Sequence, residues 1–303
     1  MRFLLLALAA CSVPLAPSSP SIDLYAAGDS SRFLLADTNG DGTRDLVVSF
    51  TGVDRGISVR IGDVRGRFGT AQRVLVGAAT VAAFDLGADG AADLIVGDGQ
   101  HIGVLPNGHG PMHVLGACRD AVLGATVDGV LTTDGHDLVL HSWDLELARP
   151  LEVAPLVPLS VNDIDGDGLA DVIGTAVGRA AVRHGTLEGF GPVHLLGDAE
   201  GVITADADGD GQDDVIAWSK SHAIAWNGKG TPIAAFGVPS DVTALAAGDL
   251  DGDGHPEIAV ASRGAVSIDG RPIEGPWTNV KQLAIVRGRL IVADAGFVAV
   301  VSP

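Results

Sequence analysis

The 303-residue sequence has little cysteine, few aromatic residues and few basic residues. Cys11 and Cys118 are its two cysteines, so a domain that begins after residue 11 can form no internal disulfide. We expect Cys118 to be a buried small apolar residue. Basic residues number 19 against 38 acidic ones, which gives a net charge of −19. Without a basic patch, this balance excludes nucleic acid as a partner.

Long apolar runs and familiar catalytic motifs are also missing. The one extended apolar stretch, at the N-terminus, is too short to cross a bilayer as a helix. No G-x-S-x-G motif, H-E-x-x-H motif or phosphate-binding glycine loop is present. The paired carboxylates that a glycosidase would need all belong to one repeated motif. The sequence therefore predicts a protein that is not an enzyme.

The repeated motif is acidic and occurs in five copies. The pattern D-x-D-x-D-G-x-x-D occupies residues 37–45, 85–93, 163–171, 206–214 and 249–257. Acids at positions 1, 3, 5 and 9, with the backbone carbonyl of position 7, place hard oxygen ligands around a cation of the size of Ca²⁺. Glycine at position 6 permits the sharp turn that this arrangement requires. The sequence therefore predicts calcium binding.

Short apolar runs flank each acidic motif. Residues 33–36 precede the first copy and 46–48 follow it, while 202–205 and 215–217 flank the fourth. Runs this short, bounded by Gly and Asp, indicate β-strands, so each motif forms the turn of a hairpin. An EF-hand loop, in contrast, lies between two helices.

The spacing of the motifs predicts the architecture. Successive copies begin 48, 78, 43 and 43 residues apart, and the interval of 78 leaves room for one more unit. A degenerate copy is expected at 131–140, with Asp137 in the closing position, and a strand–turn–strand at 283–292 makes seven units. Neither of these two loops retains enough acids for a metal. Periods of about 40 to 50 residues built of short strands are typical of β-propeller blades.

The two ends of the chain predict how the ring closes. The seventh unit has room for three strands, near 282–286, 289–293 and 297–301. Residues 22–27 resemble the fourth strand of the other units. A strand there that completes the seventh blade would leave no open sheet edge. We therefore predict an all-β fold, a seven-bladed β-propeller over residues 22–303 that is closed by an N-terminal strand.

These repeats resemble the FG-GAP/VCBS family, which is best known from the propeller of integrin α chains. The resemblance covers about residues 21–303 and includes the Phe-Gly and Gly-Pro phrases at 66–69, 108–111 and 189–192. It implies that the acidic hairpins bind Ca²⁺, about four or five ions in all. Five ions would reduce the net charge from −19 to about −9, so the metal-free chain is expected to be strained by repulsion.

The resemblance also assigns the metal ligands, position by position. They are Asp37, Asn39, Asp41, Thr43 and Asp45 in the first motif; Asp85, Asp89, Ala91 and Asp93 in the second; Asp163, Asp165, Asp167, Leu169 and Asp171 in the third; Asp206, Asp208, Asp210, Gln212 and Asp214 in the fourth; and Asp249, Asp251, Asp253, His255 and Glu257 in the fifth. Position 7 contributes its backbone carbonyl. Asn39 can replace a carboxylate, whereas Gly87 leaves the second motif one ligand short and lowers its expected affinity.

The N-terminus has the features of an export signal. A basic start, a short apolar core and small residues precede Cys11. Leu8-Ala-Ala-Cys11 resembles the bacterial lipobox, which implies cleavage before Cys11 and its lipidation; the alternative is an ordinary secretory signal. Residues 1–10 are then a signal peptide, and 11–21 a lipidated cysteine with an extended Pro/Ser-rich tether. The expected location is extracytoplasmic, on the bacterial envelope or cell surface, with a lipid anchor in the membrane.

The turns on the face away from the acidic loops are suited to recognition. We expect this face to carry Asp54, Arg55, Gln100, His101, Trp143, Asp144, Lys220 and Arg263. The prediction is a monomeric binding or adhesion module whose partner is an unknown protein or glycan. A lectin that stacks sugars on Trp143, Trp218 or Trp226 is one alternative. A polysaccharide lyase with Arg, His, Tyr or Lys over the channel is another.

Overall fold

A computed structural model of the chain describes residues 21–26, 32–50, 55–77, 80–126, 129–133, 138–151, 156–186 and 189–302. The predicted signal peptide, Cys11 and nearly all of the predicted tether lie outside these residues. The described residues form an all-β structure with one short 3₁₀ helix, η1 (Pro106–Gly108). No helix among them is long and apolar enough to cross a membrane.

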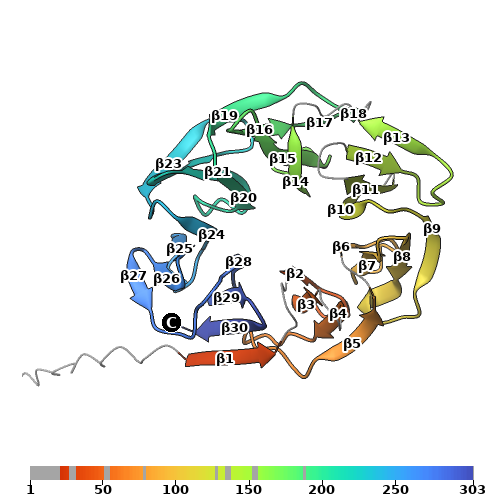
Figure 1. Ribbon diagram of the computed structural model, residues 1–303, viewed down its shortest axis with the longest axis horizontal. Coiled ribbons are helices and arrows are strands. Elements are labelled where there is room, and N and C mark those ends of the chain that lie inside the picture. Colours follow the sequence, from red (N-terminus) through yellow and green to blue (C-terminus); the bar gives the residue numbers. More distant parts are fainter. Residues whose placement is uncertain are drawn as a thin grey trace, which may run out of the picture.

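Seven antiparallel four-stranded sheets stand in a ring around a central channel (Figure 1). This arrangement confirms the predicted seven-bladed β-propeller. In blades 1 to 6 the strands follow chain order across the sheet, with the first strand at the channel and the fourth at the periphery. Each blade is therefore a meander whose successive turns alternate between the two faces of the ring.

The first three blades lie in the first half of the chain. Blade 1 contains β2 (Arg32–Ala36), β3 (Asp45–Phe50), β4 (Gly56–Arg60) and β5 (Gln72–Val76). Blade 2 contains β6 (Thr80–Phe84), β7 (Asp93–Gly97), β8 (His101–Leu105) and β9 (His113–Ala117). Blade 3 contains β10 (Ala121–Thr126), β11 (Gly129–Thr133), β12 (Leu138–His141) and β13 (Ala148–Leu151).

The next three blades complete the chain-ordered part of the ring. Blade 4 contains β14 (Val157–Asn162), β15 (Asp171–Ala176), β16 (Arg179–Arg183) and β19 (His194–Asp198), with a small added hairpin of β17 (Gly185–Thr186) and β18 (Gly189–Phe190). Blade 5 contains β20 (Gly201–Ala205), β21 (Asp214–Ser219), β22 (His222–Trp226) and β23 (Pro232–Gly237). Blade 6 contains β24 (Val242–Gly248), β25 (Glu257–Ser262), β26 (Ala265–Ile268) and β27 (Arg271–Ile273).

Blade 7 joins the two ends of the propeller. Its strands are β28 (Gln282–Val286), β29 (Arg289–Asp294), β30 (Phe297–Ser302) and β1 (Ser21–Ala26). The N-terminal strand β1 runs antiparallel to β30 along its whole length, from Ser21 opposite Ser302 to Ala26 opposite Phe297. The predicted closure is confirmed, and the strand begins one residue before the predicted start. The backbone pairing of β1 leaves β30 with a partner on both sides and so ties the ring shut.

Small apolar side chains fill the space between neighbouring blades. Between blades 1 and 2, Val47, Ile57 and Leu94 are fully buried. Burying each of them stabilises the fold by about 1.5–3 kcal/mol. Trp218 shows why few aromatics are accommodated, because it faces Gly201, where a Cβ would come within 2.0 Å of the indole ring. The low aromatic content thus fits blades that pack closely.

The predicted degenerate loop in blade 3 is out of register by one strand. Segment 131–140 spans β11 and β12, which are the second and third strands of the blade. The acidic loops join first and second strands, so their equivalent here is 127–128, which lies outside the described residues, as does Asp137. The prediction was wrong because every hairpin of a meander has the same pattern of an apolar run, a turn and an apolar run. The hairpin of the second and third strands was therefore taken for that of the first and second. In blade 7, segment 283–292 does join β28 and β29, as predicted.

The same error of one strand led to the wrong face of the ring being predicted for two residues. We define the acidic-loop face as the one with the turns between first and second strands, and the opposite face as the other. Arg55, Lys220 and Arg263 lie in or beside turns between second and third strands, so they belong to the opposite face, as predicted. Trp143 and Asp144 lie between β12 and β13, the third and fourth strands. They therefore belong to the acidic-loop face.

Candidate metal centres

The five acidic loops occupy equivalent places in blades 1, 2, 4, 5 and 6. Each joins the first strand of its blade to the second, so all five lie on the acidic-loop face. The first aspartate of each loop folds the turn around its own carboxylate. In blade 4, Asp163 accepts hydrogen bonds from the backbone N–H groups of Gly166 (2.8 Å) and Gly168 (2.9 Å). Gly168 has a φ of +85°, a conformation that glycine adopts without strain.

Carboxylates converge in the three loops that match the motif completely. One oxygen from each member of a triad lies within 4.8 Å of the others in three sets: Asp163, Asp165 and Asp167; Asp206, Asp208 and Asp210; Asp249, Asp251 and Glu257. Among the described residues, loops 37–45 and 85–93 form no such triad of acids. These two loops carry Asn39 and Gly87 at position 3, where the others carry an aspartate. The structure thus separates the three complete loops from the two that lack an aspartate at position 3.

The closing aspartate of four loops is buried and holds the hairpin together. The exposed fractions are 0% for Asp45, 6% for Asp93, 0% for Asp171 and 1% for Asp214. In each of these loops one carboxylate oxygen accepts a hydrogen bond from the backbone N–H of position 2, seven residues earlier. Position 9 was predicted only as a ligand, and this structural role is not apparent from the motif.

Three of these aspartates also reach a second turn of their own blade. Asp45 accepts a hydrogen bond from the N–H of Gly62 at 2.8 Å, and Asp171 accepts one from Gly185 at 2.7 Å. Asp93 accepts the equivalent bond from Asn107 at 2.8 Å. All three donors follow the third strand of the blade. The carboxylate therefore fastens the acidic loop to the neighbouring turn on the same face.

Blade 4 brings a histidine to its acidic loop. The Nδ1 atom of His184 lies 3.4 Å from Asp165 Oδ2 and 3.5 Å from Asp171 Oδ1. That nitrogen is buried and has no hydrogen-bond partner among the described residues. The same position relative to the closing aspartate is held by Ile61 in blade 1 and Pro106 in blade 2. His184 is thus an added nitrogen donor that sequence spacing could not reveal, because it lies on another turn.

The surroundings of two closing aspartates disfavour their charged form and raise their pKa values. Burial, reinforced by the nearby charges of Asp208, Asp210 and Asp206, raises the pKa of Asp214 from 3.8 to about 6. Burial likewise raises the pKa of Asp171, against the lowering effect of hydrogen bonds from Gly185 and Ile164. A divalent cation beside these carboxylates would offset both their repulsion and their loss of hydration.

The channel has a small charged group at one mouth. Arg44 and Asp213 occupy position 8 of their loops, in blades 1 and 5, and both line a channel cavity of about 640 Å³. Asp213 accepts a hydrogen bond from Asn162 Nδ2. Burial raises the pKa of Asp213, against the lowering effects of that hydrogen bond and of Arg44. Lys281 also lines this cavity. Of the four residue types expected of a lyase, arginine and lysine line this cavity, whereas the described residues that line it include no histidine or tyrosine.

Two of the three tryptophans considered for sugar stacking are in the core. Trp218 is 8% exposed and Trp226 is 7% exposed. Trp226 packs over Gly197, where a Cβ would lie 2.7 Å from its ring. Trp143 is partly buried and lies 6.0 Å from the ring of Phe84. Trp218 and Trp226 therefore serve blade packing and present no face to a sugar.

The fold and these loops define a class of protein: a seven-bladed β-propeller with candidate metal centres on one face. Residues 206–260 match the model of the FG-GAP-like repeat family. The matched segment runs from the acidic loop of blade 5 to that of blade 6 and into β25. The resemblance to FG-GAP repeats is therefore confirmed there, and the chain carries an FG-GAP-like repeat in a seven-bladed propeller.

Solved structures with a similar fold align over nearly the whole chain. No curated protein matches the sequence. The structure of BBS1N in complex with ARL6DN aligns with a TM-score of 0.61 and 14% identity, covering 93% of this chain and 95% of that one. An Agrocybe aegerita lectin that recognises non-reducing terminal N-acetylglucosamine aligns with a TM-score of 0.55 and 19% identity, covering 92% of this chain and 86% of that one. At these identities the likeness concerns the fold alone.

Proposed function

We propose that the protein is a calcium-stabilised propeller that acts as a binding or adhesion module, tethered to the outside of a membrane by a lipid on Cys11. The observation that supports calcium is the convergence of three carboxylates in each of the three complete loops. The ions are structural, and four or five are expected. The protein works as a monomer, and its partner is a protein or a glycan.

Oxygen ligands favour calcium over softer metals at the loops that have no nitrogen donor beside them. Loop 206–214 offers four carboxylates and the backbone carbonyl of Gln212, and contains no sulfur or nitrogen ligand. Ca²⁺ takes six to eight such oxygens in a flexible geometry, whereas Zn²⁺ prefers four ligands that include nitrogen or sulfur. Loop 37–45 can act in the same way, because the side-chain oxygen of Asn39 replaces one carboxylate. Loop 85–93 has one ligand fewer and is the weakest of the five.

The opposite face is the proposed recognition surface. Its turns place exposed side chains at their tips, including Val177 (77% exposed) and Arg263 (84% exposed side chain). Val177, Lys220 and Arg263 all adopt positive φ angles of 47°, 55° and 36°. Each belongs to a two-residue hairpin turn, which requires a positive φ, and the turn presents its side chain at the tip. Arg55 and Lys220 also lie on this face, whereas the charge of Arg263 is paired with Asp241.

A protein partner is favoured over a sugar. The structural neighbour BBS1N was solved with a protein partner, and the other neighbour is a lectin. The lectin hypothesis relied on three tryptophans, of which Trp218 and Trp226 are buried. Trp143 lies on the acidic-loop face, away from the proposed surface. A pull-down from the native envelope, with and without chelator, tests the proposal; capture of glycans alone would favour the lectin.

The calcium sites can be tested by changing one loop at a time. Asp165→Ala removes a ligand from a complete loop and should cost that site most of its affinity, so calorimetry should count one ion fewer. Gly87→Asp adds the missing carboxylate in blade 2. A Cβ at Gly87 would meet nothing closer than 3.6 Å, and its φ is outside the left-handed region, so the side chain fits. We expect this variant to tighten the weakest site.

The matched control for these variants changes a charge away from the loops. Asp241→Ala removes an acid that pairs with Arg263 on another part of the ring, and it should leave the number of bound ions unchanged. Equal ion counts for the wild type and Asp165→Ala would contradict the proposed ligands, as would a lost ion in Asp241→Ala.

The lipid anchor is tested separately. Cys11→Ser should move the protein from the membrane fraction to the soluble fraction, because lipid chains rather than a helix would hold it there. Fractionation followed by immunoblotting measures the distribution. If the variant stays with the membranes and the precursor is processed as in the wild type, an ordinary signal or another anchor replaces the lipobox hypothesis.

A further inference from the structure

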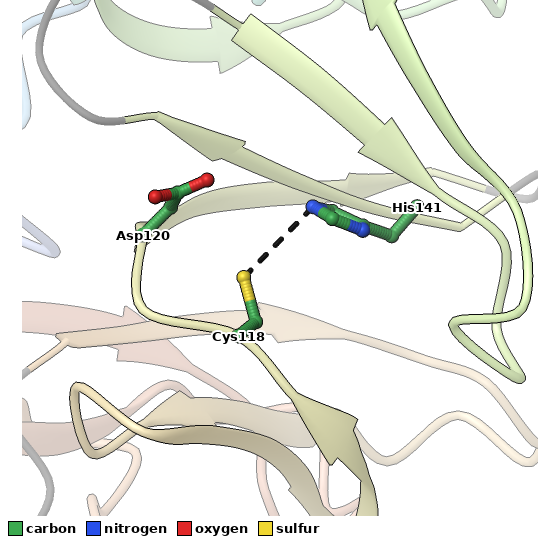
Figure 2. A group of neighbouring side chains, drawn as sticks. All are labelled: Cys118, Asp120 and His141. Carbon is green, nitrogen blue, oxygen red and sulfur yellow. Dashed lines mark hydrogen bonds between the residues drawn. The ribbon is translucent and has the colours of Figure 1, made fainter.

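A second kind of side-chain cluster lies between blades 2 and 3, apart from the acidic loops. Cys118 and Asp120 belong to the connection from β9 to β10, and His141 is the last residue of β12 (Figure 2). One ligand atom of each lies within 4.8 Å of the other two. The Sγ atom of Cys118 is 3.9 Å from His141 Nε2. Three residues of different chemistry thus converge from two parts of the chain.

The arrangement of the cluster matches a metal site better than a nucleophile. In a Cys–His–Asp nucleophile the carboxylate holds the imidazole nitrogen remote from the thiol. Figure 2 shows the Asp120 carboxylate on the same side of the ring as the nitrogen that faces Cys118. All three donors therefore point toward one small volume.

The position of the histidine suits a ligand. Its Nε2 atom faces the cluster, 3.9 Å from Cys118 Sγ. The hydroxyl oxygen of Thr132 lies 3.0 Å from the same nitrogen, and the tautomer of the ring decides which atom donates in this contact. In the neutral tautomer that carries its proton on Nδ1, the Nε2 lone pair is available to a metal ion.

We propose that Cys118, Asp120 and His141 form a binding site for Zn²⁺ or a similar divalent transition metal. Thiolate, imidazole and carboxylate are the three ligand types that Zn²⁺ takes in proteins, and the fourth position stays open to water. When the metal binds, the sulfur–metal bond replaces the S–H bond and the proton passes to solvent. Ca²⁺ is excluded from this site, because it prefers oxygen ligands and needs more of them.

The site has a structural use in the blade that lacks an acidic loop. None of the five motifs falls between the acidic loops of blades 2 and 4, so blade 3 has no calcium site of its own kind. Cys118 is 9% exposed and packs with Ile102 of blade 2 and Val130 of blade 3. A metal held there would tie the inter-blade connection to β12. This inference stands on different residues from the calcium sites and does not depend on them.

Cobalt provides the direct test, because Co²⁺ occupies zinc sites and reports a bound thiolate. The full chain, with the acidic loops saturated with Ca²⁺, is titrated with Co²⁺. We expect one equivalent of Co²⁺ to produce a thiolate-to-cobalt charge-transfer band, and one equivalent of Zn²⁺ to abolish it. Cys118→Ser should lose the band, and His141→Gln and Asp120→Asn should weaken cobalt binding at least about tenfold.

Two controls separate the site from other effects. Cys11→Ser removes the other thiol and should keep the band, as should Thr132→Val, which removes the hydroxyl next to His141 without removing a ligand. Circular dichroism of each variant shows whether the fold is intact. A wild-type protein without the band, or a folded Cys118→Ser variant that keeps it, would overturn the proposal. Loss of the band in the Cys11→Ser variant would also overturn the proposal.

Discussion

Removal of calcium is expected to lower the unfolding temperature of the propeller by about 15 °C. A ligand at a hundred times its dissociation constant stabilises the folded state by about 2.7 kcal/mol per site, so three complete loops contribute roughly 8 kcal/mol. A domain of this size shifts by about 2 °C for each kcal/mol. The source of the effect is visible at Asp214, whose pKa of about 6 reflects burial beside three other acids. Thermal unfolding with calcium and with chelator measures the shift.

Magnesium at the same concentration is the control for this experiment. Mg²⁺ requires a stricter octahedral geometry and gives up its water reluctantly, so it should restore little of the lost stability. High salt tests screening alone, and it should recover only the part due to long-range repulsion. A melting curve that is the same with calcium and chelator would refute the calcium proposal. It would leave the inference about Cys118 and His141 untouched.

Asp45→Ala is expected to destabilise the protein by about 4 kcal/mol even without calcium. The carboxylate is fully buried and accepts hydrogen bonds from the backbone N–H groups of Thr38 (2.9 Å) and Gly62 (2.8 Å), and from the Thr38 hydroxyl. Each buried donor left without a partner costs about 1–3 kcal/mol. Urea unfolding of the metal-free protein measures the loss, since no ion can contribute there.

Asp41→Ala is the matched comparison in the same loop. Asp41 is exposed and accepts hydrogen bonds from the N–H of Thr43 (2.7 Å) and from Asn39 Nδ2 (3.0 Å). Its removal should leave the metal-free protein within about 1 kcal/mol of the wild type, because water can replace these exposed contacts. It should nevertheless weaken calcium binding at this loop. Equal losses for the two variants in metal-free protein would show that position 9 has no structural role beyond binding the ion.

The contrast between these two aspartates separates two roles within one motif. Position 5 faces solvent and is available to a cation. Position 9 joins the first turn of the blade to the turn after the third strand, as Asp45 does with Gly62. The acid at position 9 can therefore stabilise the fold whether or not its loop binds a metal. In loop 85–93, the weakest of the five proposed sites, Asp93 keeps both hydrogen bonds although position 3 is a glycine.

Much of the fold was predictable because its determinants are local and repeated. The five motifs repeat at nearly constant spacing, and each turn is closed by hydrogen bonds within itself, such as Gly168 to Asp163. The number of blades and the place of β1 followed from that period and from the three strands left for blade 7. Blade 3 was misread by one strand, because it lacks the acidic motif that marks the register elsewhere.

The sequence by itself determined the ring, its closure and the loops in which acids converge, since these depend on spacing along one hairpin. Only the tertiary structure decided what lies beside those hairpins. It buried Trp218 and Trp226, placed His184 on the loop of blade 4, and brought His141 to Cys118. These contacts join residues on different turns or blades, and they depend on how sheets pack against one another. The periodicity of a single strand contains no information about that packing.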